Sequence, residues 1–201
     1  MKDHTFPLIE VSGSAHEMGY QHGAQTAGMV ERYLLWIEKL TGESRDVLCR
    51  KAMAFLPALE TGNPVLLEEV RGLAEGAGIS FEEAMLCQVR AEATQVNEGC
   101  TCFAVRGEVT AGSELFAGQN QDLESEYADV AILLRLKPSD GRPRILQFTF
   151  AGQLGYAGMN EHGVCAFNNA LYNFAFQPNL TNYMLSRMML EAKNVKEVID
   201  V

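Results

Sequence analysis

The first half of the chain repeats its hydrophobic positions with the spacing of amphipathic helices. Residues 64–77 show this best, because their apolar side chains fall on one helical face. Ser14 with Glu17 and Ser80 with Glu83 have the spacing of capping boxes. The pattern predicts a short strand near 7–11, then helices over 14–40, 44–56, 64–77 and 80–89, with Thr41-Gly42 ending the first and Gly76 and Gly78 closing the third.

The second half of the chain changes to short apolar runs of strand length. The runs predict strands over 102–105, 115–119, 130–136, 144–150 and 164–168. Gly112, Asp140-Gly141 and the glycines 152, 155 and 158 are typical of turns. A helix is predicted from Thr181 with Met184, Leu185, Met188 and Met189 as its apolar face, and another after Asn194. Helices, then strands, then helices indicate layers of helix around antiparallel sheet, an α+β fold.

Length and charge narrow the classes of protein. The chain has 201 residues and 47% apolar residues, which suits one globular domain over 1–201. The net charge of −10 argues against a nucleic-acid partner and against anionic membranes. No apolar run reaches the roughly 18 residues that span a bilayer, and residues 1–7 lack the apolar core of a signal peptide. We therefore expect a cytoplasmic protein.

The cysteines and histidines indicate neither a disulfide framework nor a metal site. Five cysteines without framework spacing predict reduced thiols. Cys49 and Cys87, on predicted helices, and Cys165, in a predicted strand, are expected in the core. His16 and His22 flank Glu17, but their spacing is not that of a zinc-protease helix, so no metal is expected.

The pair Gly99-Cys100 carries the strongest chemical signal. It follows Glu98 at the change from helix to strand pattern, and Thr101-Cys102 comes next. Cleavage before a cysteine would give one residue both a thiol nucleophile and an α-amine base. Glycine before the cysteine tolerates strained backbone geometry that would favour attack on its carbonyl. Cys102 is the rival nucleophile, on the same strand face but without a preceding glycine.

Polar residues farther along the chain are candidate partners of Cys100. Asp122 ends a predicted strand, where its carboxylate would either orient the amine or thiol or remain a solvated turn residue. Asn120 would present an amide or fix that turn. Asn168 and Asn169 would either stabilise an oxyanion or bond at a strand end. We expect Cys100 to begin a central strand, with its sulfur facing a cleft and Asp122 within hydrogen-bond reach.

Four stretches carry a resemblance to a known family. They are Met18-Gly19-Tyr20-Gln21-His22-Gly23; residues 68–77 leading to Arg90 and Glu92; Gly99-Cys100-Thr101 with Gly118-Gln119-Asn120 and Asp122; and Gly158-Met159-Asn160, Gly163-Val164 and 168–171. In these stretches the chain resembles the acyl-coenzyme A:6-aminopenicillanate acyltransferase (isopenicillin N acyltransferase-like) family of N-terminal-nucleophile hydrolases. Members are longer, so the resemblance implies truncation at the C-terminus.

The resemblance implies a fold and a set of functional residues. The fold would be an αββα sandwich, with a helical segment 1–99 and a nucleophile-bearing strand segment 100–201 that is incomplete at its C-terminus. Cys100, Asp122 and Asn120 would be catalytic, the bond between Gly99 and Cys100 would be cleaved, and Thr101, Asn168 and Asn169 would be substrate or oxyanion candidates. Arg90 and Glu92 would either serve processing or pair on a surface.

The leading function is therefore a self-processing amidohydrolase or acyltransferase. It would act on a small-molecule amide or acyl donor through a Cys100 thioester, without a cofactor and with acyl-coenzyme A as a candidate donor. One alternative is a non-catalytic family fragment that binds a small molecule or a partner chain. Another is a cysteine hydrolase with His162 as a separate base. Assembly into a homo-oligomer is left open.

Overall fold

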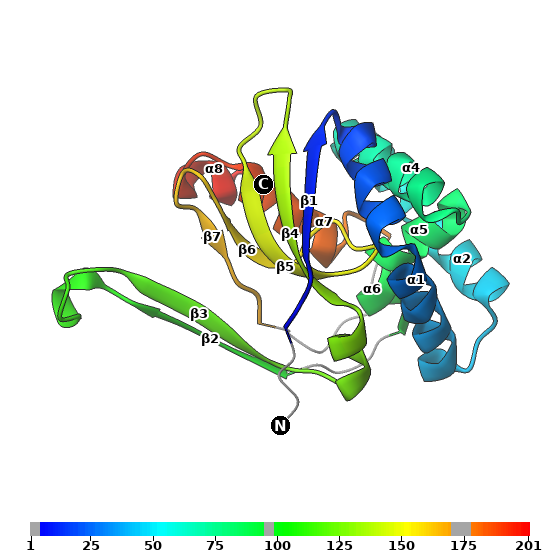
Figure 1. Cartoon of the computed structure of the whole chain (residues 1–201), viewed down its shortest axis with the longest axis horizontal. Coiled ribbons are helices and arrows are strands. Elements are labelled where there is room, and N and C mark those ends of the chain that lie inside the picture. The colour runs from blue at the N-terminus through cyan, green and yellow to red at the C-terminus, as the bar shows by residue number, and fades with distance from the viewer. Residues whose placement is uncertain (1–4, 95–98, 170–177) are drawn as a thin grey trace.

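The structure is a computed structural model that describes residues 5–94, 99–169 and 178–201. Within these residues, a five-stranded sheet carries helices on one face, and a two-stranded ribbon extends away from this body (Figure 1). The sheet has the order β1-β4-β5-β6-β7, formed by Leu8–Gly13, Ala131–Pro138, Ile145–Phe150, Ala157–Asn160 and Cys165–Ala166. β1 runs parallel to β4, whereas the other neighbours are antiparallel, so the sheet is mixed and not antiparallel throughout. The architecture is compatible with the α+β class.

The helices begin and end near the predicted residues wherever local sequence signals are strong. Both capping boxes are present, Ser14 with Glu17 and Ser80 with Glu83, and Gly42 closes the first helix in the left-handed conformation. The helices are α1 (Ala15–Thr41), α2 (Arg45–Met53), α3 (Leu56–Gly62), α4 (Pro64–Ala77), α5 (Phe81–Gln88), α6 (Arg90–Thr94), α7 (Asn182–Glu191) and α8 (Val195–Ile199).

The prediction of a single helix over 44–56 is wrong, because the chain forms two helices there. α2 ends at Met53, and α3 begins at Leu56 with Pro57 in its first turn. A proline lacks the N–H that a continuing helix needs but is tolerated in a first turn. Pro57 therefore marks the start of a new helix and not the end of the previous one.

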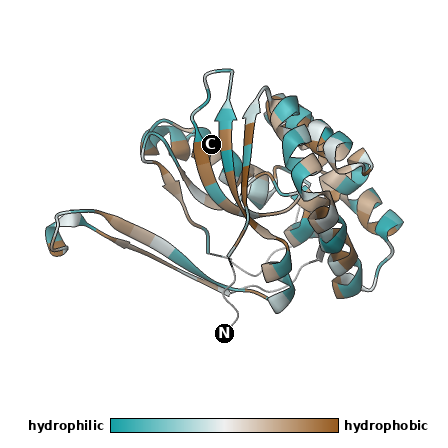
Figure 2. Ribbon diagram, viewed as in Figure 1, coloured by the Kyte–Doolittle hydropathy of each residue, from teal (hydrophilic) through white to brown (hydrophobic). Residues whose placement is uncertain are grey.

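The two faces of the sheet differ in what covers them. Alternate residues of β4, among them Ile132 and Leu134, are buried under the helices, while Arg135 and Lys137 face solvent. The helices themselves mix hydrophobic and hydrophilic residues, as amphipathic packing requires (Figure 2). Apolar side chains also remain on the open face, including Met159 at 48% exposure.

The cysteines follow these environments. Cys87 is buried as predicted, Cys49 is half-buried, and Cys165 is exposed. The core prediction for Cys165 is therefore wrong. In β7 the strand alternation buries Ala166 and leaves Cys165 at an exposed position. Burial raises the pKa of Cys49 to about 11 and that of Cys87 further, so both thiols stay protonated at neutral pH.

α1 and α4 pack with their backbones in direct contact through four glycines. A Cβ on Gly19 would lie 1.9 Å from the Glu69 carbonyl oxygen, and one on Gly72 would lie 2.0 Å from the His16 carbonyl oxygen. Gly23 and Gly76 make equivalent approaches one turn further along. Gly76 therefore lies inside α4 as a packing residue, and the predicted closing role belongs to Gly78, which caps the helix in the left-handed conformation.

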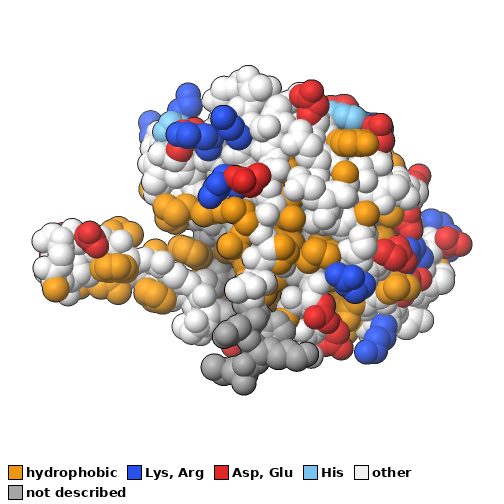
Figure 3. Space-filling model, viewed as in Figure 1, with side chains coloured by type: hydrophobic (Ala, Val, Ile, Leu, Met, Phe, Trp, Pro, Cys, Tyr) orange, Lys and Arg blue, Asp and Glu red, His pale blue; other side chains and the backbone are white. Residues whose placement is uncertain are grey.

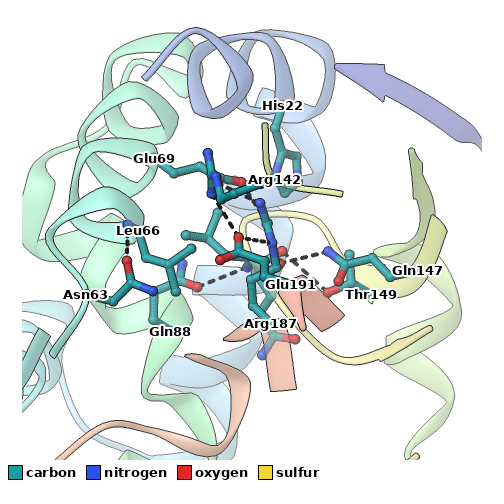
Figure 4. A network of polar contacts seen from close by, with 12 residues as sticks. His22, Asn63, Leu66, Glu69, Gln88, Arg142, Gln147, Thr149, Arg187 and Glu191 are labelled. Atoms are coloured by element: carbon teal, nitrogen blue, oxygen red, sulfur yellow. Dashed lines mark hydrogen bonds and ion pairs between the residues drawn. The ribbon is translucent and has the colours of Figure 1, made fainter. Parts of the chain in front are cut away.

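A buried ion pair joins α4 to α7. Arg187 donates two hydrogen bonds of 2.9 Å to the two carboxylate oxygens of Glu69, and both side chains are excluded from solvent. Arg187 also contacts Glu191, which accepts a hydrogen bond of 2.8 Å from Arg142 (Figure 4). This chain of charges links helices that are distant in sequence.

The loop between β5 and β6 is held from the helix layer by two polar side chains. Gln88 donates to the Gly152 carbonyl at 2.6 Å and accepts from the Leu154 N–H at 3.0 Å. The buried His22 accepts from the Gly152 N–H at 3.3 Å through Nε2. Burial, and then the charge of Arg187, lower the pKa of His22 to about 4, so the imidazole is neutral at neutral pH.

The outer edge of β1 is closed by two glutamines of α1. Gln21 accepts from the Ser12 N–H at 3.0 Å and donates to the Ser12 carbonyl at 2.8 Å. Gln25 donates to the Glu10 carbonyl at 3.1 Å. These amides take the hydrogen bonds that a further strand would make at this edge.

The glycine contact predicts an asymmetric response to added methyl groups. Gly72→Ala should lower the free energy of unfolding by about 2–3 kcal/mol, because the new Cβ would overlap backbone that cannot rotate away. The control is Gly28→Ala in α1, since a Cβ there would meet no atom within 4 Å outside the backbone of its own helix. Gly28→Ala should be neutral or stabilising by up to about 1 kcal/mol. Urea titration measures both, and equal effects would contradict the close packing.

Burial of His22 predicts a loss of stability in mild acid. The unfolded state takes up a proton near pH 6.5 and the folded state only near pH 4, so lowering the pH through this window favours unfolding. The imidazole should account for a loss of about 3 kcal/mol between these limits. Urea titration across this pH range gives the free energy of unfolding of the parent and of His22→Gln. The difference between the two isolates the contribution of the imidazole. A His22→Gln variant with the same pH dependence as the parent would contradict this prediction.

Candidate functional site

Cys100 lies on the ribbon and not on the main sheet. β2 (Gly99–Val105) pairs antiparallel with β3 (Phe116–Asp122), and among the described strands it pairs with no other. The expectation that Cys100 begins a central strand is therefore wrong. The cause is that β2 pairs with β3, the next strand along the chain. The connection between the two strands contains the short 3-10 helix Gly107–Val109.

The register of the ribbon decides which side chains share a face. Cys100 lies opposite Gln121, and Cys102 lies opposite Gln119. These four side chains are half-buried and form the inner face of the ribbon. Thr101, Asn120 and Asp122 alternate with them and are exposed, so they form the outer face.

Asp122 accordingly lies beside the peptide bond before Cys100, on the face opposite the Cys100 side chain. Asp122 pairs with Gly99, and a Cβ on Gly99 would stand 3.2 Å from the Asp122 Oδ2 atom. No hydrogen bond joins these described side chains of Cys100 and Asp122, so the expected thiol contact is absent. The carboxylate is next to the Gly99 end of the candidate scissile bond.

The structure also gives a different reason for glycine at position 99. Gly99 lies in an extended strand and not in the left-handed region, so backbone strain is not its role. A side chain there would instead press against the Asp122 carboxylate. Glycine leaves room for that carboxylate to approach the chain.

An open groove of about 850 Å³ runs between the ribbon and the open face of the sheet. On the ribbon side, β3 lines it with Phe116 and with the polar residues 119–122. On the sheet side its lining residues are mainly apolar: Leu133, Leu146, Phe148, Ala157, Met159, Cys165 and Phe167. Figure 3 shows hydrophobic side chains gathered where the ribbon meets the body. The groove can accept an apolar group next to a polar wall.

Gly158, predicted as a turn residue, instead lies inside β6 and lines this groove. A Cβ there would lie 2.6 Å from the Leu146 carbonyl oxygen of the neighbouring strand. Glycine at this position therefore permits a close approach between strands. The pattern of three spaced glycines hid the strand from sequence analysis.

Asn168 is fixed by partners that sequence analysis did not assign. The Gln119 side chain donates to the Asn168 carbonyl at 2.7 Å and accepts from the Asn168 N–H at 3.2 Å. The Asn168 amide donates to the Ser186 hydroxyl at 2.7 Å, which leaves one of its two protons for another acceptor. Asn169 is exposed, and residues 170–171 of the same motif lie outside the described part.

Arg90 and Glu92 are both buried, so pairing on a surface is wrong for them. The Arg90 guanidinium lies 5.2–5.9 Å from the ring centres of Trp36, Tyr127 and Tyr183. Glu92 accepts from the Asn182 N–H at 3.0 Å, and burial raises its pKa. These contacts anchor α6, the helix that precedes β2. Residues 95–98, which join α6 to β2, lie outside the described part.

The two candidate nucleophiles differ in their surroundings. Burial, with a contribution from nearby Cys100, raises the pKa of Cys102 and so disfavours its thiolate. His162, the candidate separate base, is exposed, and its backbone N–H donates to the Asn160 side-chain oxygen in a turn. These features favour Cys100 over its rival.

In the described ranges, no group of three or more histidine, cysteine or acidic residues is arranged to hold a metal ion. None of the helices in these same ranges combines the length and the apolar character that crossing a membrane requires.

Comparison with known proteins shows a similarity between this chain and an acyltransferase. No protein-family model matches the chain. The chain is 26% identical over 204 residues to the acyl-coenzyme A:6-aminopenicillanic-acid-acyltransferase 40 kDa form of Emericella nidulans, a match that covers 96% of this chain and 55% of that protein. The chain thus spans about half the length of this curated relative. The similarity supports a distant relationship between the chain and that acyltransferase.

Proposed function

We propose that the chain is a self-processing N-terminal-cysteine amidohydrolase or acyltransferase with Cys100 as its nucleophile. The observation that carries this proposal is the placement of the Gly99–Cys100 bond. Asp122 stands against Gly99 and lines the groove, whereas Cys100 is not among the lining residues but lies opposite Gln121, which is one of them. The distant similarity to an acyltransferase supports the same class of reaction.

Processing would begin with attack of the Cys100 sulfur on the Gly99 carbonyl carbon. The thiol proton passes to the departing nitrogen, the C–N bond breaks, and Gly99 becomes a thioester on the cysteine. Water then hydrolyses the thioester and leaves a Gly99 carboxylate and a free Cys100 α-amine. The Asp122 carboxylate, one position from this bond, would hold the new ammonium group.

Turnover would use the two groups that processing creates. The α-amine, with an ordinary pKa of about 8, accepts the thiol proton as the sulfur attacks an acyl carbonyl. The acyl group then sits on Cys100 as a thioester until water or an amine takes it. The proposed donor to the developing oxyanion is the second amide proton of Asn168, because the backbone of Asn168 is bonded to Gln119 on the same ribbon face as Cys100. The apolar lining of the groove suits the acyl chain of an amide or acyl-coenzyme A donor, and the reaction needs no cofactor.

The proposal extends to the fold. In an αββα sandwich a second sheet covers the open face of the first. The apolar side chains on the open face and the ribbon beside it support this arrangement, because two packed sheets bury the inner face of each. We propose that β2 and β3 belong to such a second sheet, and that 1–99 and 100–201 are the two segments of one processed domain.

A non-catalytic binding fragment is the competing function. The groove between ribbon and sheet would serve a bound small molecule equally well without any cleavage. The two functions differ in one property, which is the covalent state of the purified chain.

Intact mass should therefore show two fragments that break between Gly99 and Cys100, in place of one chain of 22.1 kDa. Cys100→Ala should abolish the cleavage, because it removes the attacking sulfur. Cys102→Ala is the matched control and should cleave normally. Asp122→Asn should slow cleavage about tenfold or more, the equivalent of about 1.4 kcal/mol of lost transition-state stabilisation.

The opposite pattern for the two cysteine variants would move the nucleophile to Cys102. A parent chain that stays uncut under reducing conditions at neutral pH would contradict self-processing and favour the binding fragment. Binding of an apolar probe in the groove, followed by fluorescence, would then test that second function.

A further inference from the structure

Gln121 is the residue directly opposite Cys100 in the ribbon. The two lie at paired positions of the ribbon, so their side chains project from the same face. Cβ atoms of directly opposed residues lie about 4.5–5.5 Å apart. A glutamine side chain is therefore long enough to reach the cysteine sulfur.

The side-chain oxygen of Gln121 is buried, and no described residue, the opposed Cys100 included, donates a hydrogen bond to it. A buried carbonyl without a donor costs about 1–3 kcal/mol, so such atoms are uncommon in native structures. Gln121 is among the residues of β3 that line the groove. Its side-chain oxygen is an acceptor available to a donor close to Cys100.

The other polar side chains of the ribbon do not compete for this role. Gln119, on the same face, is occupied at both ends by the Asn168 backbone. Asn120 and Asp122 belong to the outer face. Within the described ribbon, Gln121 is thus the acceptor on the inner face opposite Cys100.

We propose that Gln121 is the positioning residue of Cys100: when the cysteine side chain turns toward its neighbour, the Gln121 side-chain oxygen accepts the thiol proton in a hydrogen bond and directs the sulfur. A carboxamide is too weak a base to remove the thiol proton, so its effect is to direct the sulfur. This inference rests on the proposed function for its role in cleavage, but the two residues are opposed in the ribbon of the uncut chain as well. The test therefore has one arm that needs no cleavage.

The first arm measures how fast iodoacetamide labels Cys100 as a function of pH, with the labelled residue identified by peptide mapping. Gln121→Glu places a like charge beside the thiolate and should slow labelling at pH 7 about tenfold. Gln121→Lys should shift the pH profile in the opposite direction by a similar amount. Opposite shifts from two variants exclude a general folding defect as their cause.

The matched controls are Ala104→Glu and Ala104→Lys. Ala104 lies on the same strand, four residues from Cys100, at a distance of about 13 Å. This exceeds the Debye length of about 8 Å at physiological ionic strength, so the controls should keep the parent profile. Profiles of Gln121→Glu and Gln121→Lys that match the parent and these controls would overturn the inference.

The second arm measures cleavage in Gln121→Met, which keeps the size of the side chain and removes its oxygen. Cleavage should slow about tenfold while iodoacetamide still labels Cys100, because the sulfur is present but no longer directed. Cleavage at the parent rate would overturn the positioning role. A parent that never cleaves would count against the proposed function alone. The labelling experiment would then show whether the Gln121 side chain acts on the Cys100 thiol.

Discussion

The bidentate ion pair between Glu69 and Arg187 is the interaction on which the arrangement of the site depends. Either charge alone in that interior would cost several kcal/mol, so α7 and α4 are bound to each other in one register. Docking of α7 brings Ser186 to the Asn168 amide and Thr181 to the Gln88 carbonyl. A helix pair far from Cys100 thereby sets the position of one candidate oxyanion donor.

Local signals in the sequence predicted much of the helical half, because caps and turns act over a few residues. The capping boxes and the turn at Gly42 are examples. Pairing between distant segments was not predictable in this way, and the parallel contact of β1 with β4 was missed. The predicted apolar face of α7 was also shifted, since Arg187 lies in the core where its partner Glu69 neutralises it. A single sequence gives no sign of such a partner.

The candidate site was predictable in its residues but not in their faces. Sequence spacing drew attention to Cys100 and Asp122, and the ribbon does place them on neighbouring strands. Whether two residues on paired strands share a face depends on an odd or even offset, which the length of the connecting turn sets. In this ribbon the register pairs Asp122 with Gly99, one residue before the cysteine, and pairs Gln121 with Cys100. Glutamines carry no motif, so their positions could be read only from the register.

The glutamines that close the β1 edge have a consequence for how the chain meets other copies of itself. An exposed strand edge is a template for adding strands from another molecule, and crowded or newly synthesised chains aggregate there. Gln21 and Gln25 occupy that template at Ser12 and Glu10 with side chains that cannot be extended into a further strand. Growth of the sheet is thereby blocked at one end, and any intermolecular strand exchange is directed away from the helix α1 side of the molecule.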